Sequence, residues 1–224
     1  MELGKAAAQA ATKVVPRSFF VLESFLRDVI FFERMIQMQT VTCSDVTLKT
    51  ALSLSFKEKI EIAKLLDKLG ISAIELPVFS GEKRDALLIK SIAASVKSSV
   101  LCVACPLDEE GIEATWAALQ EARRARLQLV VPTSTVQMEY ICHKKPPVVL
   151  DMIGKLVKKA KSLCADVEFV AQDASRSEPE FLESAIRTAI DAGATLVTVS
   201  DDAGIMTAEE FSAFIGDLQR VCVI

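Results

Sequence analysis

The stretch that decides the fold is Lys57-Glu-Lys-Ile-Glu-Ile-Ala-Lys-Leu-Leu-Asp-Lys-Leu-Gly-Ile-Ser-Ala-Ile-Glu-Leu76. Apolar residues recur at helical spacing in its first part, and they predict a helix over 56–69. Gly70 follows, and glycine commonly ends a helix because it adopts a left-handed backbone without strain. The last part, 71–76, carries two isoleucines and a leucine and predicts a strand. The stretch is therefore a helix followed directly by a strand.

This alternation of strands and helices continues along the chain. Further helices are predicted over 83–96, 108–124, 147–164, 179–192 and 207–220. Further strands are predicted over 38–43, 99–105, 127–131, 167–171 and 195–199, and 221–224 predicts the start of a seventh strand. Repeated units of this kind are typical of parallel strands joined by helical crossovers. The sequence therefore predicts an α/β fold.

Two parallel folds fit this pattern, an open doubly wound sheet and a closed (β/α)8 barrel. No G-x-G-x-x-G motif follows a predicted strand, so the main signal of a dinucleotide-binding sheet is missing. Polar residues follow nearly every predicted strand, and that edge is where a barrel carries its active site. The sequence thus favours a TIM (β/α)8-type barrel domain over 38–224, incomplete, with about six β/α units and a seventh strand.

The segment over 1–37 differs from the rest and is predicted to be a helical N-terminal extension rich in phenylalanine. Charged residues such as Glu23, Arg27 and Asp28 interrupt its apolar part. It therefore matches neither a membrane span of about twenty apolar residues nor the uncharged core of a secretory signal. We interpret it as a helix that packs its phenylalanine face on the main domain. An interface for a partner or a membrane surface is the alternative, and a transit peptide stays open.

Composition and charge exclude several classes of protein. The chain has 224 residues, 51% apolar and 25% charged, with 8 Gly and 7 Pro, which argues against disorder. Its net charge of −4 gives no support for binding nucleic acid. Cys102 and Cys105 form a C-x-x-C motif, but residues three apart on a strand point to opposite faces, so we expect neither a zinc nor a redox site. The cysteines predict reduced, buried thiols in a cytoplasmic protein: Cys43, Cys102, Cys105, Cys142, Cys164 and Cys222.

Four motifs share the order and spacing of one superfamily. They are the stretch over 57–76, Val131-Pro-Thr-Ser-Thr-Val-Gln-Met138, Gln172-Asp-Ala-Ser-Arg-Ser177 and Ser200-Asp-Asp-Ala-Gly204. On these residues the chain resembles 2-isopropylmalate synthase and homocitrate synthase, of the DRE-TIM barrel enzymes that include hydroxymethylglutaryl-CoA lyase. The resemblance runs from about Met38 to Ile224. Gln137 stands where isopropylmalate synthases usually have His. At this position the chain is similar to the nitrogen-fixation type of homocitrate synthase.

The resemblance implies a Claisen-type condensation, in which the methyl group of acetyl-CoA attacks the keto carbon of a 2-oxo acid. Such a reaction needs a divalent metal to polarise the keto group, a cation for the developing negative charge, and a base for the methyl proton. In the family the first strand ends in a D-T-T-L-R-D-G-E-Q type sequence. There the arginine is the electrostatic stabiliser, the following acid binds the metal, and an H-x-H pair on the seventh strand completes the metal site.

The stretch Asp45-Val-Thr-Leu-Lys-Thr50 looks like the active-site strand of this family, but several of its positions and others depart from the family pattern. Lys49 falls on the arginine position and keeps the positive charge, but it lacks the planar guanidinium group that can bind two oxygens at once. Thr50 falls on the metal-binding acid and supplies no anionic ligand. Asp202 stands where the family has a threonine that helps to hold the substrate carboxylate. The H-x-H pair lies past Ile224 in the family pattern, and His143 alone does not replace it. We therefore expect no metal ligands in this chain and no catalysis by the chain alone.

Other positions match polar residues of the family site. The resemblance implies catalytic roles for Lys49 and Glu75, and substrate binding by Thr133, Ser134, Gln137, Asp173, Ser175, Arg176 and Asp201. Each has a simpler alternative interpretation. Asp173 and Arg176 could form an ion pair that only braces a loop, and Glu75 could be a solvated strand end. Asp201 could simply precede a helix cap near Thr207.

The expected function is that of a subunit or divergent homologue of an acyl-CoA:2-oxo-acid acyltransferase. No cofactor is expected for the chain alone, although the resemblance implies a divalent metal, with acetyl-CoA and a 2-oxo acid as substrates. An open barrel leaves unpaired backbone groups on its edge strands, so we expect a second chain or self-association to complete it. Two alternatives stay open: a non-catalytic protein that binds a small acid or regulates a true synthase, and a barrel lyase or aldolase that uses Lys49 as a Schiff-base amine.

Overall fold

The computed structural model describes residues 42–50 and 53–222. The chain divides into two compact units, Met1–Val41 and Thr42–Ile224, and every described residue belongs to the second. The helical extension predicted over 1–37 lies outside the described residues. No helix in the described part is long and apolar enough to cross a bilayer.

Six parallel strands in the described part form one sheet, in the order in which they occur along the chain. Neighbouring strands pair in register, so that Glu75 lies opposite Cys102 and Gln128 opposite Glu168. The predicted β/α units of an incomplete barrel are thereby confirmed. The strands are β1 Ser44–Asp45, β2 Ala73–Leu76, β3 Val100–Ala104, β4 Ala125–Pro132, β5 Val167–Gln172 and β6 Leu196–Val199.

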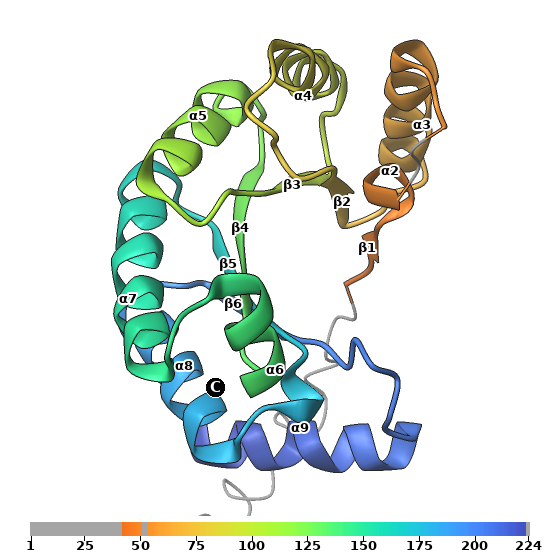
Figure 1. The fold of residues 1–224 in the computed structure, drawn as a ribbon. Coiled ribbons are helices and arrows are strands. Elements are labelled where there is room, and N and C mark those ends of the chain that lie inside the picture. The colour runs from red at the N-terminus through yellow and green to blue at the C-terminus, as the bar shows by residue number, and fades with distance from the viewer. Residues whose placement is uncertain (1–41, 51–52, 223–224) are drawn as a thin grey trace, which may run out of the picture. The chain divides into compact units, whose positions relative to one another are not determined.

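Five of the long helices connect successive strands and α9 follows β6, and Figure 1 shows α4, α5, α7 and α8 following one another along the same side of the sheet. The long helices are α3 Phe56–Lys68, α4 Lys83–Ser95, α5 Glu109–Leu119, α7 Pro146–Leu163, α8 Pro179–Asp191 and α9 Ala208–Cys222. Four shorter helical segments occupy the loops at the carboxyl ends of the strands: α2 Thr47–Thr50, α6 Thr135–Gln137, the π-helix η1 Met138–Cys142 and the 3-10 turn η2 Ala174–Arg176.

Capping residues explain where two of the long helices begin. The Ser55 side chain accepts the Glu58 backbone N–H at 3.4 Å, and the Glu58 carboxylate accepts the Ser55 N–H at 2.8 Å. Thr207 and Glu210 form the same reciprocal pair before α9, at 3.3 and 2.8 Å. Each pair satisfies two backbone donors that the first helical turn leaves unpaired. The helix cap expected near Thr207 is thus confirmed.

The two faces of the sheet differ in character. The face toward the helices is apolar, and Leu127, Leu129 and Phe169 on it are at most 1% exposed. The opposite face carries a polar layer around Glu168, whose carboxylate accepts Gln128 Nε2 at 3.0 Å and Thr198 Oγ1 at 2.7 Å. The main hydrophobic core therefore lies between strands and helices, whereas the inner face of the sheet carries this polar layer.

The segment over 45–50, expected as an active-site strand, is mostly helical. Strand β1 ends at Asp45, and α2 begins at Thr47. The Asp45 carboxylate accepts the Thr47 N–H at 3.0 Å and the Thr47 hydroxyl at 3.2 Å, so it caps the turn in the way that favours a helix start. Leu48, fully buried, anchors the turn in the core. This prediction was wrong because a local side-chain cap competes with the strand.

The ends of other elements also differ from the sequence predictions. Helix α9 continues through Cys222, so the seventh strand does not begin at Val221. Cys222 is buried and lies four residues after Leu218, which packs on the core, so the apolar helical stripe extends to it. Helix α5 ends at Leu119, five residues before the predicted end, and no glycine or proline marks that boundary in the sequence. Residues 38–41 of the first predicted strand lie outside the described residues.

Candidate functional site at the carboxyl ends of the strands

The predicted site residues lie in two groups beyond the carboxyl ends of the parallel strands. Lys49 and Glu75 contact each other beside β1 and β2. Ser134, Asp173 and Asp201 belong to a hydrogen-bonded cluster that joins the loops after β4, β5 and β6. The sheet order places the ends of β1 and β2 apart from those of β4, β5 and β6, with β3 between them.

The first group is an ion pair built on the helical turn α2. The Lys49 ammonium lies 2.7 Å from Glu75 Oε2, and the Ser44 hydroxyl donates to Glu75 Oε1 at 3.0 Å. The Glu75 side chain is only 14% exposed, whereas that of Lys49 is 35% exposed. Glu75 is therefore not a solvated strand end, and that alternative is wrong. Its carboxylate fixes the position of the ammonium, which remains open to solvent on its other side.

The second group is centred on Asp173, whose side chain is fully buried. Arg176 donates to it through Nε at 2.8 Å and through a terminal nitrogen at 2.6 Å, and the Ser134 hydroxyl donates at 2.5 Å. Hydrogen bonds from Arg176, and after them the Ser134 hydroxyl, hold the pKa of Asp173 below its usual value although burial opposes this. Asp173 also adopts a left-handed backbone with φ of 58°. The ion pair considered for Asp173 and Arg176 is confirmed.

Three further predicted residues, Ser175, Asp201 and Thr133, are held by hydrogen bonds in the same cluster. The Ser175 hydroxyl donates to Asp201 Oδ1 at 2.5 Å, and the Met206 N–H donates to Asp201 Oδ2 at 3.0 Å. These donors lower the pKa of Asp201. The Thr133 hydroxyl donates to the Gln172 carbonyl at 2.9 Å. These groups are therefore occupied by bonds within the chain.

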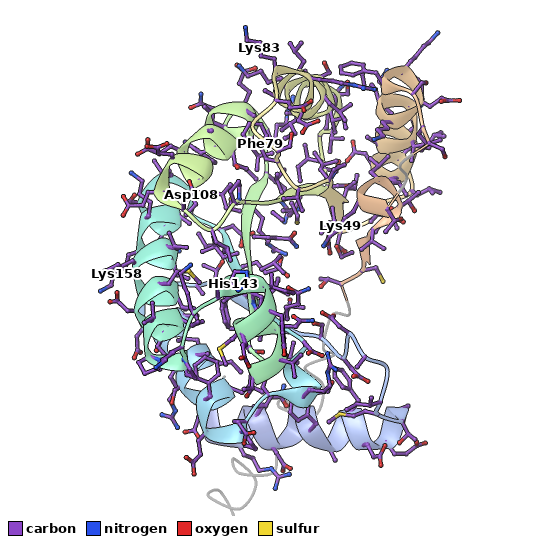
Figure 2. The ribbon with its side chains drawn as sticks, viewed as in Figure 1. Lys49, Phe79, Lys83, Asp108, His143 and Lys158 are labelled. Atoms are coloured by element: carbon purple, nitrogen blue, oxygen red, sulfur yellow. The ribbon has the colours of Figure 1, made fainter. Side chains whose placement is uncertain are left out.

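Gln137 is the one predicted residue whose side chain keeps a buried acceptor unpaired. Its Oε1 has no hydrogen-bond partner among the described residues, whereas its backbone N–H reaches Ser134 Oγ at 3.3 Å. His143, at the end of η1, lines a separate cavity of about 410 Å³ with Lys144 and Lys145. Figure 2 labels His143 on the connection after β4, on a different element from Lys49 at α2.

Two residues of these groups were missed by the sequence interpretation. Ser44 binds Glu75, and Ser177 donates to the Thr133 hydroxyl at 2.7 Å. Ser177 ends one of the motifs that carry the resemblance, so its position was a usable signal. Ser44 had no such signal, because its partner lies 31 residues away in the sequence.

The metal implied by the resemblance does not fit the donors of the described residues. The carboxylates of Asp45, Glu75, Asp173 and Asp201 each accept hydrogen bonds from this chain's own N–H, O–H or ammonium groups. A hard divalent cation needs several free oxygen ligands converging on one point. Within residues 42–50 and 53–222, no three His, Cys, Asp or Glu side chains come together in that way. We therefore assign no metal ligand and derive no step through a metal.

The C-x-x-C thiols point to opposite faces of β3, as predicted. Cys105 packs in the main core, whereas Cys102 packs with Ala73 and Val100 on the inner face. Burial raises the pKa of both thiols to about 12. The prediction that all six cysteines are buried was wrong, because Cys43 is exposed and Cys142 is half-buried.

Iodoacetamide at neutral pH is expected to alkylate Cys43 and to leave Cys102 and Cys105 unmodified in the folded protein. The thiolate is the nucleophile, and the raised pKa values make it scarce at the two buried sites. Peptide mass spectrometry before and after denaturation measures this difference. Modification of Cys102 as fast as Cys43 without denaturation would contradict the described burial.

Sequence comparison assigns the chain to a known family. The HMGL-like family model matches residues 37–223. The chain belongs to the HMGL-like family. Similar relatives include the 2-isopropylmalate synthases of Clostridium kluyveri, 34% identical over 84% of this chain and 36% of that protein, and of Aquifex aeolicus, 38% identical over 75% of this chain and 32% of that protein. The chain thus spans about a third of the length of these curated relatives.

A solved structure supports the fold of this HMGL-like chain. The crystal structure of hydroxymethylglutaryl-CoA lyase from Pseudomonas aeruginosa superposes with a TM-score of 0.64, covering 80% of this chain and 63% of the lyase chain. Sequence identity is 15%, so this likeness establishes the incomplete barrel and nothing about the substrate. The family match and the synthase relatives show the family, and the lyase structure shows the fold.

Proposed function

We propose that this chain is a divergent homologue of an acyl-CoA:2-oxo-acid acyltransferase that binds the 2-oxo acid and does not complete acyl transfer by itself. In the expected reaction, a carbon–carbon bond forms between the acetyl methyl carbon and the keto carbon. The methyl proton goes to a base, and the keto oxygen takes up negative charge and then a proton. A later hydrolysis releases CoA.

One observation carries this proposal: the carboxylates at the carboxyl ends of the strands accept hydrogen bonds from donors of the same chain. Lys49 supplies a fixed positive charge held by Glu75, and this charge suits the carboxylate of an acid. The Asp173 cluster keeps the loops after β4, β5 and β6 in place. In this proposal the described residues supply the cation for the acid and a rigid frame. The remaining groups for acyl transfer would come from a second chain or another copy.

The same observation favours a second candidate function, a non-catalytic protein that binds a small acid. Acid binding without turnover in every combination of chains would support it. The Schiff-base alternative has less support. A Schiff-base lysine works from a desolvated, apolar pocket, whereas the Lys49 ammonium is hydrogen-bonded to a carboxylate and its side chain is 35% exposed.

Release of CoA tests the proposal. The chain is incubated with acetyl-CoA, Mn²⁺ and either 3-methyl-2-oxobutanoate or 2-oxoglutarate, and free thiol is measured. We expect no release above background from the chain alone, and release above the synthase's own rate when the 2-isopropylmalate synthase of the same genome is added. Full activity by the chain alone would overturn the requirement for a second chain. No gain with that synthase, together with acid binding, would favour the non-catalytic function.

A further inference from the structure

A cavity of about 270 Å³ lies beside Lys49, between the first turns of α3 and α4. Part of its wall is apolar, because Leu54, Phe56, Leu88 and Ile89 line it, and the last two are buried. Lys49 also lines this cavity, and its ammonium is held in place by Glu75. The cavity therefore combines one fixed cation with an aliphatic wall.

The Lys49 ammonium has donor capacity that the chain leaves unused. An ammonium carries three N–H donors, and among the described residues Lys49 donates only to Glu75. The remaining donors are available to a ligand in the cavity. A hydrogen bond from an ammonium to a carboxylate is charge-assisted, and partial exclusion of water strengthens it.

The other charged residues of the cavity are two cations and two acids. Lys59 and Arg84 line it, and neither has an ion-pair partner in the part of the chain that the structure describes. Two acids also line it, Glu82 and Asp85, but the Asp85 carboxylate already accepts the Ser80 hydroxyl and the Ser80 N–H. Glu82 and Asp85 offset the charges of Lys59 and Arg84, so Lys49 is the unmatched cation of the lining, and the cavity suits a ligand that carries a single negative charge.

We propose that this cavity binds a short aliphatic carboxylic acid through Lys49 and without a divalent metal. The carboxylate accepts hydrogen bonds from the Lys49 ammonium, and the carbon chain packs on Leu88 and Ile89. Lys49 held by Glu75 then provides at this edge the positive charge that a metal provides elsewhere. This inference rests on the proposed function, because it names the acid site and its cation.

Isothermal titration of the full chain with 3-methyl-2-oxobutanoate tests the inference. We expect binding in EDTA, with an affinity that added Mn²⁺ changes by less than about twofold. Lys49→Met should weaken binding by about tenfold or more. Lys64→Met is the matched control on α3, since Lys64 pairs only with the exposed Glu61, and it should bind as the unmodified chain does. The methyl ester of the acid, which lacks the carboxylate charge, should bind far more weakly.

The opposite results would overturn the inference. Binding that requires Mn²⁺, binding unchanged in Lys49→Met, or no heat at millimolar acid each contradicts it. Because Lys49→Met leaves Glu75 without its partner, the double variant Lys49→Met with Glu75→Gln removes the charge without that imbalance and should lose binding to the same extent. Acid binding that depends on Lys49 without CoA release in any mixture would refute the proposed acyl transfer alone. CoA release with no dependence of binding on Lys49 would refute this inference alone.

Discussion

Replacing Arg176 with leucine is expected to lower the free energy of unfolding at neutral pH, and by more than the removal of an exposed ion pair does. The substitution leaves the Asp173 carboxylate, which is fully buried, without its charged partner. Removing one member of a buried pair is costly because the remaining charge is desolvated. The loss is moderated because Arg176 itself is 41% exposed and the Ser134 hydrogen bond to Asp173 remains. Urea unfolding followed by circular dichroism measures the change.

The same variant should change the pH dependence of stability in a defined direction. In the unmodified chain the pKa of Asp173 is lowered, so its contribution is present above the unfolded pKa of about 4 and is lost as pH falls through the folded pKa. Without Arg176 the unpaired buried carboxylate gains by taking up a proton. The stability difference between Arg176→Leu and the unmodified chain should therefore shrink as the pH is lowered toward 4.

Two further variants control this experiment. Arg220→Leu removes an arginine from an exposed pair with Asp217, whose side chains are 77% and 71% exposed, and should cost less than about 1 kcal/mol. Arg176→Leu combined with Asp173→Asn removes the stranded charge and should recover part of the loss. Equal effects of Arg176→Leu and Arg220→Leu would show that Asp173 does not depend on its partner.

Replacing Phe169 with alanine is expected to cost about 3–5 kcal/mol, which is the usual loss for a large buried aromatic residue. Phe169 is fully buried on β5 and faces the helices, where the hydrophobic core lies. The cost includes the lost burial of the ring and the cavity that it leaves. Thermal and urea unfolding measure it.

Val170→Ala is the matched control, because it tests the inner face of β5 while Phe169→Ala tests the face that packs on the helices. Val170 follows Phe169 directly and points to the inner face of the sheet, where it is half-buried. Removing its two methyl groups should cost about 1 kcal/mol or less, because little packing surrounds them. A larger loss for Val170→Ala than for Phe169→Ala would mean that the main core lies on the inner face of the sheet.

Much of the fold could be predicted because each element carries its own periodic signal. The predicted helix over 83–96 and the observed α4, Lys83–Ser95, differ by one residue, and the strand predicted over 167–171 matches β5, Val167–Gln172. Amphipathic helices and buried strands depend mainly on local patterns, so a single sequence reveals them. Boundaries set by longer-range packing were less accurate, as the end of α9 at Cys222 illustrates.

The position of the candidate site could be predicted from the sequence, but most contacts between its residues could not. Polar residues at strand ends indicated the correct edge, and Asp173 and Arg176, three residues apart, could be recognised as a possible pair. The contact between Lys49 and Glu75 joins residues 26 apart and depends on the turn α2, which the sequence interpretation took for a strand. Hydrogen bonds between residues distant in the sequence arise from the tertiary fold, so local sequence patterns do not predict them.

The decisive measurement is a crystal structure of the chain soaked with 3-methyl-2-oxobutanoate in the presence of EDTA. We predict the acid in the cavity between α3 and α4, with its carboxylate about 3 Å from the Lys49 ammonium and no metal between them. An acid bound elsewhere, or one that appears only when Mn²⁺ is added and is held through that ion, would contradict metal-free binding by Lys49.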